Sequence, residues 1–254
     1  MTAPLQLSET VQGDGETLLI AHGLFGSARN WGVVAKRLAD ARRVVTVDMR
    51  NHGASPWSDA AGYPGMASDL GAAVGRHGGT ADLLGHSMGG KAAMQLALTR
   101  PEAVRRLIVA DIAPVAYDHS QSHLIAAMRV IGTEFASRAD ADAALSVHVP
   151  EAGVRAFLLQ SLDLREGRWR LNLDALEAHM DAITGWPGTD GIYEGPALFL
   201  SGAASDYVRR EHRAGILAQF PKARFAKIPG AGHWLHAERP REFEAAVRTF
   251  LDRA

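Results

Sequence analysis

Cysteine is absent from this sequence of 254 residues. Its absence excludes disulfide bonds, thiolate metal sites, iron–sulfur clusters and cysteine nucleophiles. The formal net charge is only -1, so no broad electrostatic field attracts nucleic acid or an anionic membrane surface. Long hydrophobic runs are missing too, since no stretch approaches the roughly 18 consecutive apolar residues of a membrane span. We therefore expect no nucleic-acid partner and no membrane span, while serine chemistry remains open.

The start of the chain, from Met1 to Glu9, has neither the basic region nor the apolar region of a secretory signal. A cytoplasmic location is the resulting prediction. The length fits one large α/β domain better than two small ones, because hydrophobic cores usually stop growing only near about 250–300 residues. A single domain is therefore expected over residues 1–254.

Short apolar runs rich in strand-forming residues alternate with helical patterns along most of the chain. The candidate strands are residues 17–21, 43–47, 81–84, 106–110, 197–200 and 223–228. The candidate amphipathic helices are residues 31–38, 88–99, 209–219 and 239–251. This alternation predicts an α/β fold with a mostly parallel central sheet and helices on both of its faces.

The alternation stops between Pro114 and Glu194, where the pattern is helical and has no strong strand. We predict a helical cap at residues 115–193, inserted between the strands that end near Asp111 and Leu200. Ligands of open α/β sheets bind outside the carboxyl ends of the strands. Such a cap would therefore roof the binding site and select the substrate.

The most informative motif is Leu83-Leu-Gly-His-Ser-Met-Gly-Gly90, a Gly-x-Ser-x-Gly pattern between an apolar strand and a helical run. A sharp strand-to-helix turn brings backbone segments so close that only glycine fits at Gly85 and Gly89. The turn exposes the serine oxygen, and the helix start behind it favours a developing negative charge. The motif predicts Ser87 as a nucleophile, although a glycine-rich turn around an ordinary serine is the alternative.

In this strand-turn-helix context the motif resembles the nucleophile turn of the α/β-hydrolase superfamily. The segment His22-Gly-Leu-Phe-Gly26 is similar to the oxyanion loop of that superfamily. The resemblance implies that the backbone N–H groups of Leu24 and Met88 hold the substrate oxyanion. Phe25 is the alternative to Leu24, because the turn could be shifted by one residue.

The resemblance also places the general base in the glycine-bounded segment Ile228-Pro-Gly-Ala-Gly-His-Trp-Leu-His236. His233 follows the last expected strand, and the chain order of nucleophile, acid and histidine agrees. A neutral imidazole accepts the serine proton near neutral pH without a large pKa shift. His233 is therefore the predicted base, whereas His22, His52, His86 and His236 are expected to be structural.

Two aspartates compete for the role of the triad acid. In the superfamily the strand at residues 197–200 is usually followed by Gly-x-x-Asp, but here Ser205 occupies that acidic position and Asp206 comes next. Asp111 ends the preceding strand, where some members of the superfamily have their acid. Because the triad is defined by geometry and not by sequence position, we favour Asp111 and keep Asp206 as the alternative.

Further segments resemble the small YbfF-type esterases within this superfamily: Asp48-Met-Arg-Asn-His-Gly-Ala-Ser55, the Gly-Gly-Lys91 extension of the nucleophile turn and Asp111-Ile-Ala-Pro-Val115. With Asn172-Leu-Asp-Ala-Leu176, the matches extend from His22 to Glu238. The resemblance implies hydrolysis of a small-molecule acyl ester or thioester. This chemistry needs no cofactor and no metal.

Other activities stay open. The same triad serves acyltransferases, perhydrolases and C–C hydrolases, and a catalytically silent ligand-binding protein could use the same scaffold. A metal enzyme is a further alternative, since His119 and His123 are spaced to share a helical face, but the usual glutamate of a zinc hydrolase motif is missing. Acyl chain length, the choice between oxygen ester and thioester, and oligomeric state do not follow from the sequence.

Overall fold

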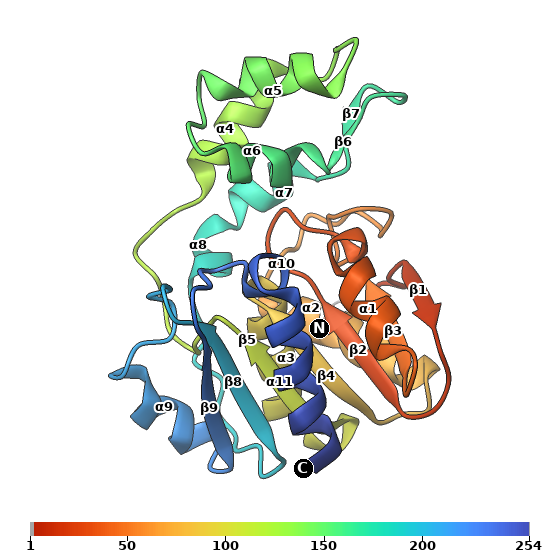
Figure 1. Cartoon of the computed structure of the whole chain (residues 1–254), viewed down its shortest axis with the longest axis vertical. Coiled ribbons are helices and arrows are strands. Elements are labelled where there is room, and N and C mark those ends of the chain that lie inside the picture. The colour runs from red at the N-terminus through yellow and green to blue at the C-terminus, as the bar shows by residue number, and fades with distance from the viewer. Residues whose placement is uncertain (1–2, 254) are drawn as a thin grey trace.

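The computed structural model describes residues 3–253, and within them the chain forms a seven-stranded sheet that carries helices on both faces (Figure 1). Residues 1, 2 and 254, including the start of the segment considered for a signal, lie outside the described residues. The strands lie in the order β1 (Glu9–Gln12), β3 (Arg43–Val47), β2 (Thr17–Ala21), β4 (Ala81–His86), β5 (Val104–Ala110), β8 (Ala197–Gly202) and β9 (Ala223–Ile228). All neighbours are parallel except β1 and β3, which are antiparallel.

All six predicted strands form, so the α/β prediction is confirmed. Strands β2, β3 and β9 have the predicted bounds, whereas β4, β5 and β8 extend further than their apolar runs. The edge strand β1 was missed because two of its four side chains are exposed, the other two are only partly buried, and the four residues form no apolar run. Side chains alternate across the sheet, so that neighbours such as Leu83 and Leu84 enter different hydrophobic clusters.

The two clusters are covered by different helices. Helices α1 (Gly32–Leu38) and α11 (Pro240–Arg253) pack on one face, and α2 (Tyr63–Arg76), α3 (Met88–Thr99) and α9 (His212–Gln219) pack on the other (Figure 1). The short elements η1 (Ala28–Trp31), η2 (Pro101–Ala103) and α10 (Leu235–Glu238) lie in connections. Helix α2 was not predicted, because four of its residues are glycines or prolines and a buried Asp69 interrupts its apolar face.

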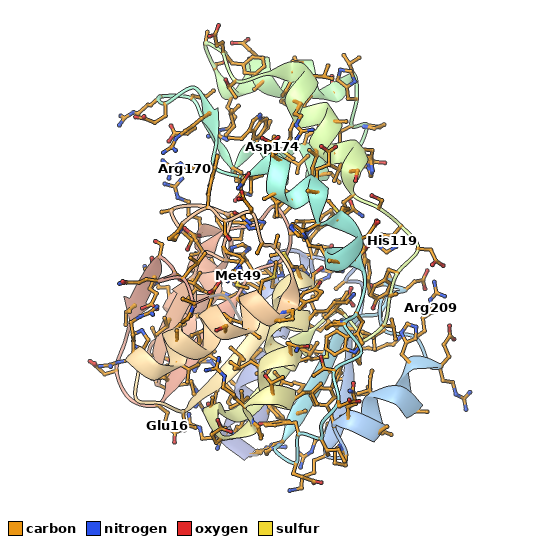
Figure 2. All side chains as sticks on the ribbon, turned by 180° about the vertical axis from the view of Figure 1, so that it is seen from behind. Glu16, Met49, His119, Arg170, Asp174 and Arg209 are labelled. Carbon is orange, nitrogen blue, oxygen red and sulfur yellow. The ribbon has the colours of Figure 1, made fainter. Side chains whose placement is uncertain are left out.

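The insertion between β5 and β8 lies at one end of the sheet, far from Glu16, with His119 where it joins the rest of the molecule (Figure 2). It contains α4 (Ser122–Ile131), α5 (Arg138–Ser146), α6 (Ala152–Leu159), α7 (Leu173–Ala178) and α8 (Met180–Thr184), together with a small hairpin of β6 (Leu162–Asp163) and β7 (Arg168–Trp169). We call residues 115–193 the cap. Its treatment as an insertion into a single domain stays a prediction.

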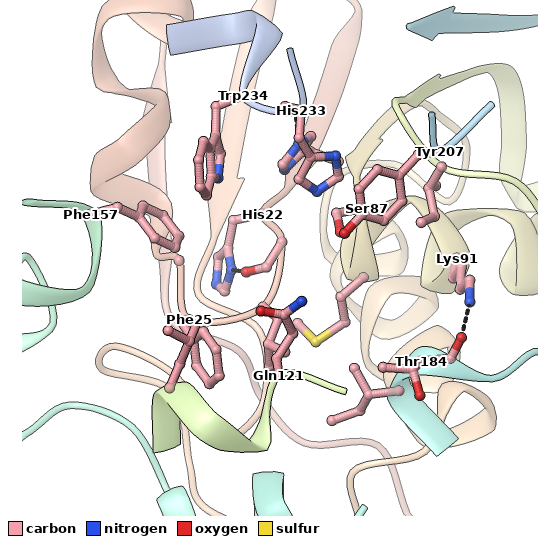
Figure 3. A pocket seen from close by; sticks show the side chains of 18 of the residues that line it. His22, Phe25, Ser87, Lys91, Gln121, Phe157, Thr184, Tyr207, His233 and Trp234 are labelled. Atoms are coloured by element: carbon pink, nitrogen blue, oxygen red, sulfur yellow. Dashed lines mark hydrogen bonds between the residues drawn. The ribbon is translucent and has the colours of Figure 1, made fainter. Parts of the chain in front are cut away.

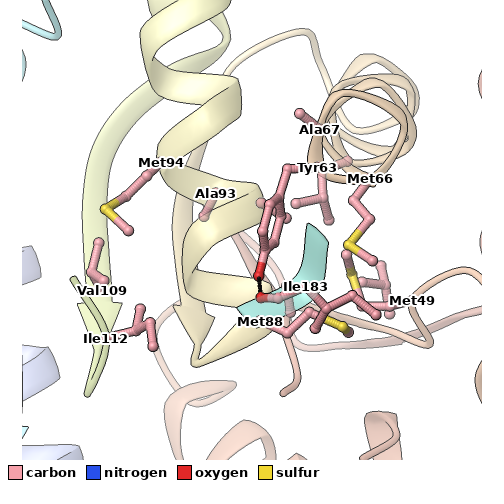
Figure 4. Close-up of a cluster of buried hydrophobic side chains, with 14 of the residues drawn as sticks. Met49, Tyr63, Met66, Ala67, Met88, Ala93, Met94, Val109, Ile112 and Ile183 are labelled. Carbon is pink, nitrogen blue, oxygen red and sulfur yellow. Dashed lines mark hydrogen bonds between the residues drawn. The ribbon is translucent and has the colours of Figure 1, made fainter. Parts of the chain in front are cut away.

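Several bonds join the cap to the sheet loops. The Gly53 N–H donates to the Arg170 carbonyl at 2.8 Å, and the Ser161 hydroxyl donates to the Phe25 carbonyl at 3.0 Å. Near the other end of the cap, the Tyr63 hydroxyl donates to the Ile183 carbonyl within the buried cluster below α3 (Figure 4). These contacts hold the cap over the carboxyl ends of the strands.

Within residues 3–253, no helix has both the length and the hydropathy that crossing a bilayer requires. The cytoplasmic location stays a prediction.

Candidate active site

Ser87 lies in the turn between β4 and α3 and has a backbone φ of 51°, which is unusual for a residue other than glycine. Its neighbours on both sides are buried, whereas Ser87 itself is partly exposed. A Cβ on Gly85 would lie 2.3 Å from the Gly89 carbonyl oxygen, and one on Gly89 would lie 2.5 Å from the Ala21 carbonyl oxygen. The glycines of the motif therefore permit the close packing that holds this strained turn.

His233 lies in the loop between β9 and α10, and its imidazole contacts Asp111. The Nδ1 atom of His233 is 2.7 Å from Oδ2 of Asp111. The Asp111 side chain is fully buried and its Oδ1 accepts the Gly202 N–H at 3.0 Å. On the other side, His86 Nε2 donates to the His233 carbonyl at 2.9 Å. The structure therefore brings the predicted base and the favoured acid together.

The alternative acid, Asp206, has an exposed side chain. Within the part of the chain that the structure describes, its carboxylate makes no hydrogen bond to His233, and its carbonyl accepts Arg209 Nε at 3.1 Å. Ser205 occupies the inward position instead, and its hydroxyl donates to Asp111 Oδ2 at 2.5 Å. The one-residue loop adjustment that Asp206 would need does not occur, because the backbone of this loop directs Ser205 toward Asp111.

Ser205 is a site residue that the sequence interpretation missed. A signal was present, because Ser205 stands where the superfamily usually has its acid. A serine at that place is too short to replace a carboxylate, yet it can donate to one that arrives from β5.

The three candidate oxyanion donors have different surroundings. The Phe25 N–H is already donated to His52 Nε2 at 3.2 Å. Among residues 3–253, no hydrogen bond uses the N–H of Leu24 or of Met88, and both residues line the same cavity as Ser87. Leu24 and Met88 therefore have N–H groups available for a substrate, whereas Phe25 does not.

The histidines around this loop act as buried supports. His22 Nε2 accepts the Met49 N–H at 2.9 Å, and burial lowers the pKa of His22 to about 4. Burial likewise lowers the pKa of His52 to about 3. Asp48 accepts the N–H groups of Ala28 and Ala54, so its carboxylate supports the same loop. These neutral imidazoles hold the backbone near Leu24 in place, and His233 is the more accessible imidazole.

A cavity of about 400 Å³ contains Ser87 and His233 in its wall (Figure 3). Its lining is mostly apolar or aromatic and comes from both the cap and the sheet loops. Phe25, Phe157 and Trp234 lie on one side of Ser87, and Lys91 and Thr184 lie on the other (Figure 3). The rings of Phe157 and Trp234, 5.7 Å apart between centroids, meet where the cap faces the His233 loop.

The chain matches a family model over most of its length. The model describes the alpha/beta hydrolase family and matches residues 18–246. The chain belongs to this family. The predicted α/β-hydrolase fold is thereby confirmed.

Two curated relatives and one solved structure of this hydrolase family are similar along nearly the whole chain. The mouse protein named sn-1-specific diacylglycerol lipase ABHD11 is 45% identical, over 98% of this chain and 86% of the relative. Esterase YbfF of Escherichia coli K12 is 40% identical, over 95% of each chain. A structure titled marine microorganism esterase aligns with a TM-score of 0.92 and 39% identity, over 97% of this chain and 99% of the other. The resemblance to YbfF-type esterases is confirmed, and by homology the chain is an enzyme of the esterase and lipase class.

Lys91 has a buried amino group in this hydrolase. The sequence interpretation used this residue only as part of a motif. Its ammonium donates to the carbonyls of Thr184 at 2.8 Å and Gly185 at 2.5 Å, and lies 4.7 Å from the centroid of the Tyr117 ring. No carboxylate of residues 3–253 lies within ion-pair distance of it. Burial lowers the pKa of Lys91 to about 7. Lys91 thus binds the end of the cap to α3, one turn beyond Ser87.

Replacing Lys91 with methionine is expected to change how stability depends on pH. The folded protein lowers the pKa of Lys91 from 10.5 to about 7, so the unfolded chain binds more protons between these values. The stability of the wild type should therefore rise relative to Lys91→Met as pH increases from 7 to 10, by about 1–3 kcal/mol. Urea unfolding of both proteins at several pH values measures this difference.

Lys36→Met is the matched control, because Lys36 is exposed on α1. Its unfolding free energy should follow the wild type across the same pH range. If the unfolding free energies of the wild type and Lys91→Met differ by a constant amount from pH 7 to 10, burial does not lower the pKa of Lys91 and the prediction is wrong.

No group of three or more histidine, aspartate or glutamate side chains in residues 3–253 is arranged to hold a metal ion. The expectation that His119 and His123 share a helical face is wrong, because α4 begins at Ser122 and His119 lies in the loop before it, where its Nε2 is 2.8 Å from the Tyr207 hydroxyl.

Proposed function

We propose that this enzyme hydrolyses carboxylic esters, or thioesters, through an acyl-enzyme intermediate on Ser87. In this proposal His233 is the general base and acid, Asp111 orients it, and the N–H groups of Leu24 and Met88 bind the oxyanion. The relatives named esterase and lipase support hydrolysis of esters in general.

The contact between His233 and Asp111 is the observation on which the mechanism rests. A bond from Nδ1–H to the buried carboxylate selects the tautomer with its lone pair on Nε2. That nitrogen can then accept the proton of Ser87, which lines the same cavity. The Gly202 N–H donates to Oδ1 of Asp111 and the Ser205 hydroxyl donates to Oδ2. Both oxygens of this carboxylate are therefore held in a fixed orientation.

The first half of the reaction forms the acyl-enzyme. Oγ of Ser87 attacks the acyl carbonyl carbon while Nε2 of His233 takes its proton, and the carbonyl electron pair moves to the oxygen. The N–H groups of Leu24 and Met88 stabilise this oxyanion. When the carbonyl re-forms, the bond to the leaving group breaks, and His233 gives its proton to the departing alcohol or thiol.

Water completes the cycle by the same steps in reverse order. His233 removes a proton from water, which attacks the acyl carbon, and the second oxyanion occupies the same two N–H groups. Collapse releases the carboxylic acid, and Ser87 recovers its proton from His233.

The cavity supports an acyl substrate of small to medium size. Its volume of about 400 Å³ lies within the range of small-molecule sites, and its aromatic walls favour apolar chains. Lys91 also lines the cavity, and burial lowers its pKa to about 7. At alkaline pH this lysine is therefore neutral and adds no charge to the cavity wall.

A stopped-flow series with p-nitrophenyl esters of increasing acyl length tests the proposal. We expect a burst of p-nitrophenol equal to the enzyme concentration, followed by slower turnover, with one preferred chain length. Product analysis in the presence of ethanol or hydrogen peroxide separates hydrolysis from acyl transfer and from perhydrolysis. The absence of both a burst and turnover for every ester would reject the proposal in favour of another chemistry or a silent binding protein.

A further inference from the structure

The loop that follows β8 contains Tyr207, whose ring stacks on the imidazole of His233 (Figure 3). The ring centroids are 4.0 Å apart and the planes differ by 20°. We propose that Tyr207 is a positioning residue for the base: its ring fixes the plane of His233 and favours the imidazolium that forms in the transition state. This inference rests on the proposed function.

Three polar contacts hold Tyr207 in place. Its N–H donates to Ser205 Oγ at 3.3 Å, and its carbonyl accepts the Tyr117 hydroxyl at 2.7 Å. Its own hydroxyl meets His119 Nε2 at 2.8 Å. Ser205 in turn donates to Asp111. These bonds therefore fix the position of the Tyr207 ring relative to Asp111 as well as to His233.

The loop thus contributes twice to the site without supplying the acid. Ser205 contacts the carboxylate of Asp111, and Tyr207 covers the imidazole that the same carboxylate orients. Asp206 lies between them and points to solvent. The turn and bends after β8 produce this pattern, because they direct Ser205 toward Asp111 and leave Asp206 exposed.

An aromatic ring stacked on His233 distinguishes the two protonation states of that histidine. The negative face of the ring attracts a cation more strongly than a neutral imidazole. Proton transfer from Ser87 turns His233 into a cation, so the ring stabilises the transition state more than the resting state. Contact on one face also limits rotation of the imidazole away from the hydrogen bond to Asp111.

Several other titratable groups surround His233. They come from different elements of the fold and are Asp111, His86, His119, His236 and Tyr207. Burial lowers the pKa of His236 to about 3 and that of His86 well below its usual value, so both are neutral. Burial raises the pKa of Tyr207, which therefore also stays neutral. Asp111 is the charged group in direct contact.

Two variants separate the ring from the hydroxyl. Tyr207→Phe keeps the ring and loses the bond to His119, whereas Tyr207→Leu keeps the apolar volume and loses the aromatic face. For a short p-nitrophenyl ester we expect Tyr207→Phe to retain at least about a third of kcat. Tyr207→Leu should lose about tenfold in kcat, with KM changed less than twofold. The acid limb of its pH profile of kcat should move about 0.5 pH units lower, because the imidazolium loses the stabilising ring.

Asp206→Asn is the matched control for disturbance of the loop and should behave as the wild type. If Tyr207→Leu does not fold, Tyr207→Met provides the comparison without a ring. Equal activity and equal pH profiles of the Phe and Leu variants would overturn the inference, as would an equal loss in both. Such results, obtained while the wild type still gives an acyl-enzyme burst, reject the role of Tyr207 alone; a wild type without the burst rejects the proposed function.

Discussion

Ser87→Ala is expected to reduce kcat for ester hydrolysis by on the order of 10⁵ to 10⁶. Removal of the hydroxyl eliminates the atom that would form the acyl-enzyme, and the neighbouring imidazole cannot act through water with similar efficiency. Substrate binding should change little, since the cavity wall contributes the contacts. Stopped-flow measurement with a p-nitrophenyl ester would show the burst in the wild type and none in the variant.

A fluorophosphonate probe supplies an independent readout for the same prediction. It should label the wild type once per chain and should not label Ser87→Ala. Ser205→Ala is a useful comparison, because the Ser205 hydroxyl contacts the Asp111 carboxylate and the Tyr207 N–H rather than the attacking hydroxyl of Ser87, so its loss should leave labelling intact. Labelling or a burst that persists in Ser87→Ala would refute the assignment of the nucleophile.

Asp111→Asn is expected to lower kcat by on the order of 10⁴. An asparagine amide at this place would donate to the imidazole, which turns His233 to the tautomer with its proton on Nε2. That tautomer cannot accept a proton from Ser87. The volume of the side chain is unchanged, so a circular dichroism spectrum and an unfolding curve close to those of the wild type should accompany the loss.

Asp206→Asn is the matched variant, because it makes the same chemical change at an exposed position four residues after the end of β8. Its kcat should stay within about twofold of the wild type, as is usual for surface substitutions away from a site. Comparable losses in both variants, or a larger loss in Asp206→Asn, would show that Asp111 is not the acid.

The sequence predicted the features that depend on contiguous residues. Apolar runs located the five inner strands, because a strand buried on both faces needs apolar side chains at successive positions, and they also located the edge strand β9. The motif around Ser87 predicted a strained turn, because Gly85 and Gly89, two residues before and after the serine, stand where a Cβ would collide with neighbouring backbone. The edge strand β1 and helix α2 lack such dense local patterns and were missed.

The sequence left open which of two adjacent residues supplies the first N–H of the proposed oxyanion hole. Leu24 and Phe25 are adjacent, and both N–H groups belong to the same turn. The tertiary structure distinguishes them, because His52 arrives from the loop after β3 and accepts the Phe25 N–H. The Leu24 N–H has no such acceptor within residues 3–253.

The sequence by itself determined the α/β fold class, the turn of Ser87 and the segment that contains His233, since each rests on residues that are close together in the chain. Only the tertiary structure decided which carboxylate meets the imidazole and what surrounds the pair. Asp111 and His233 are 122 positions apart, and their contact requires β5, β8 and β9 to pair in register. The loop after β8 starts beside Asp111 because of this pairing, in which the Asp111 N–H donates to the Leu200 carbonyl, and its turns then direct Ser205 toward Asp111 and leave Asp206 exposed.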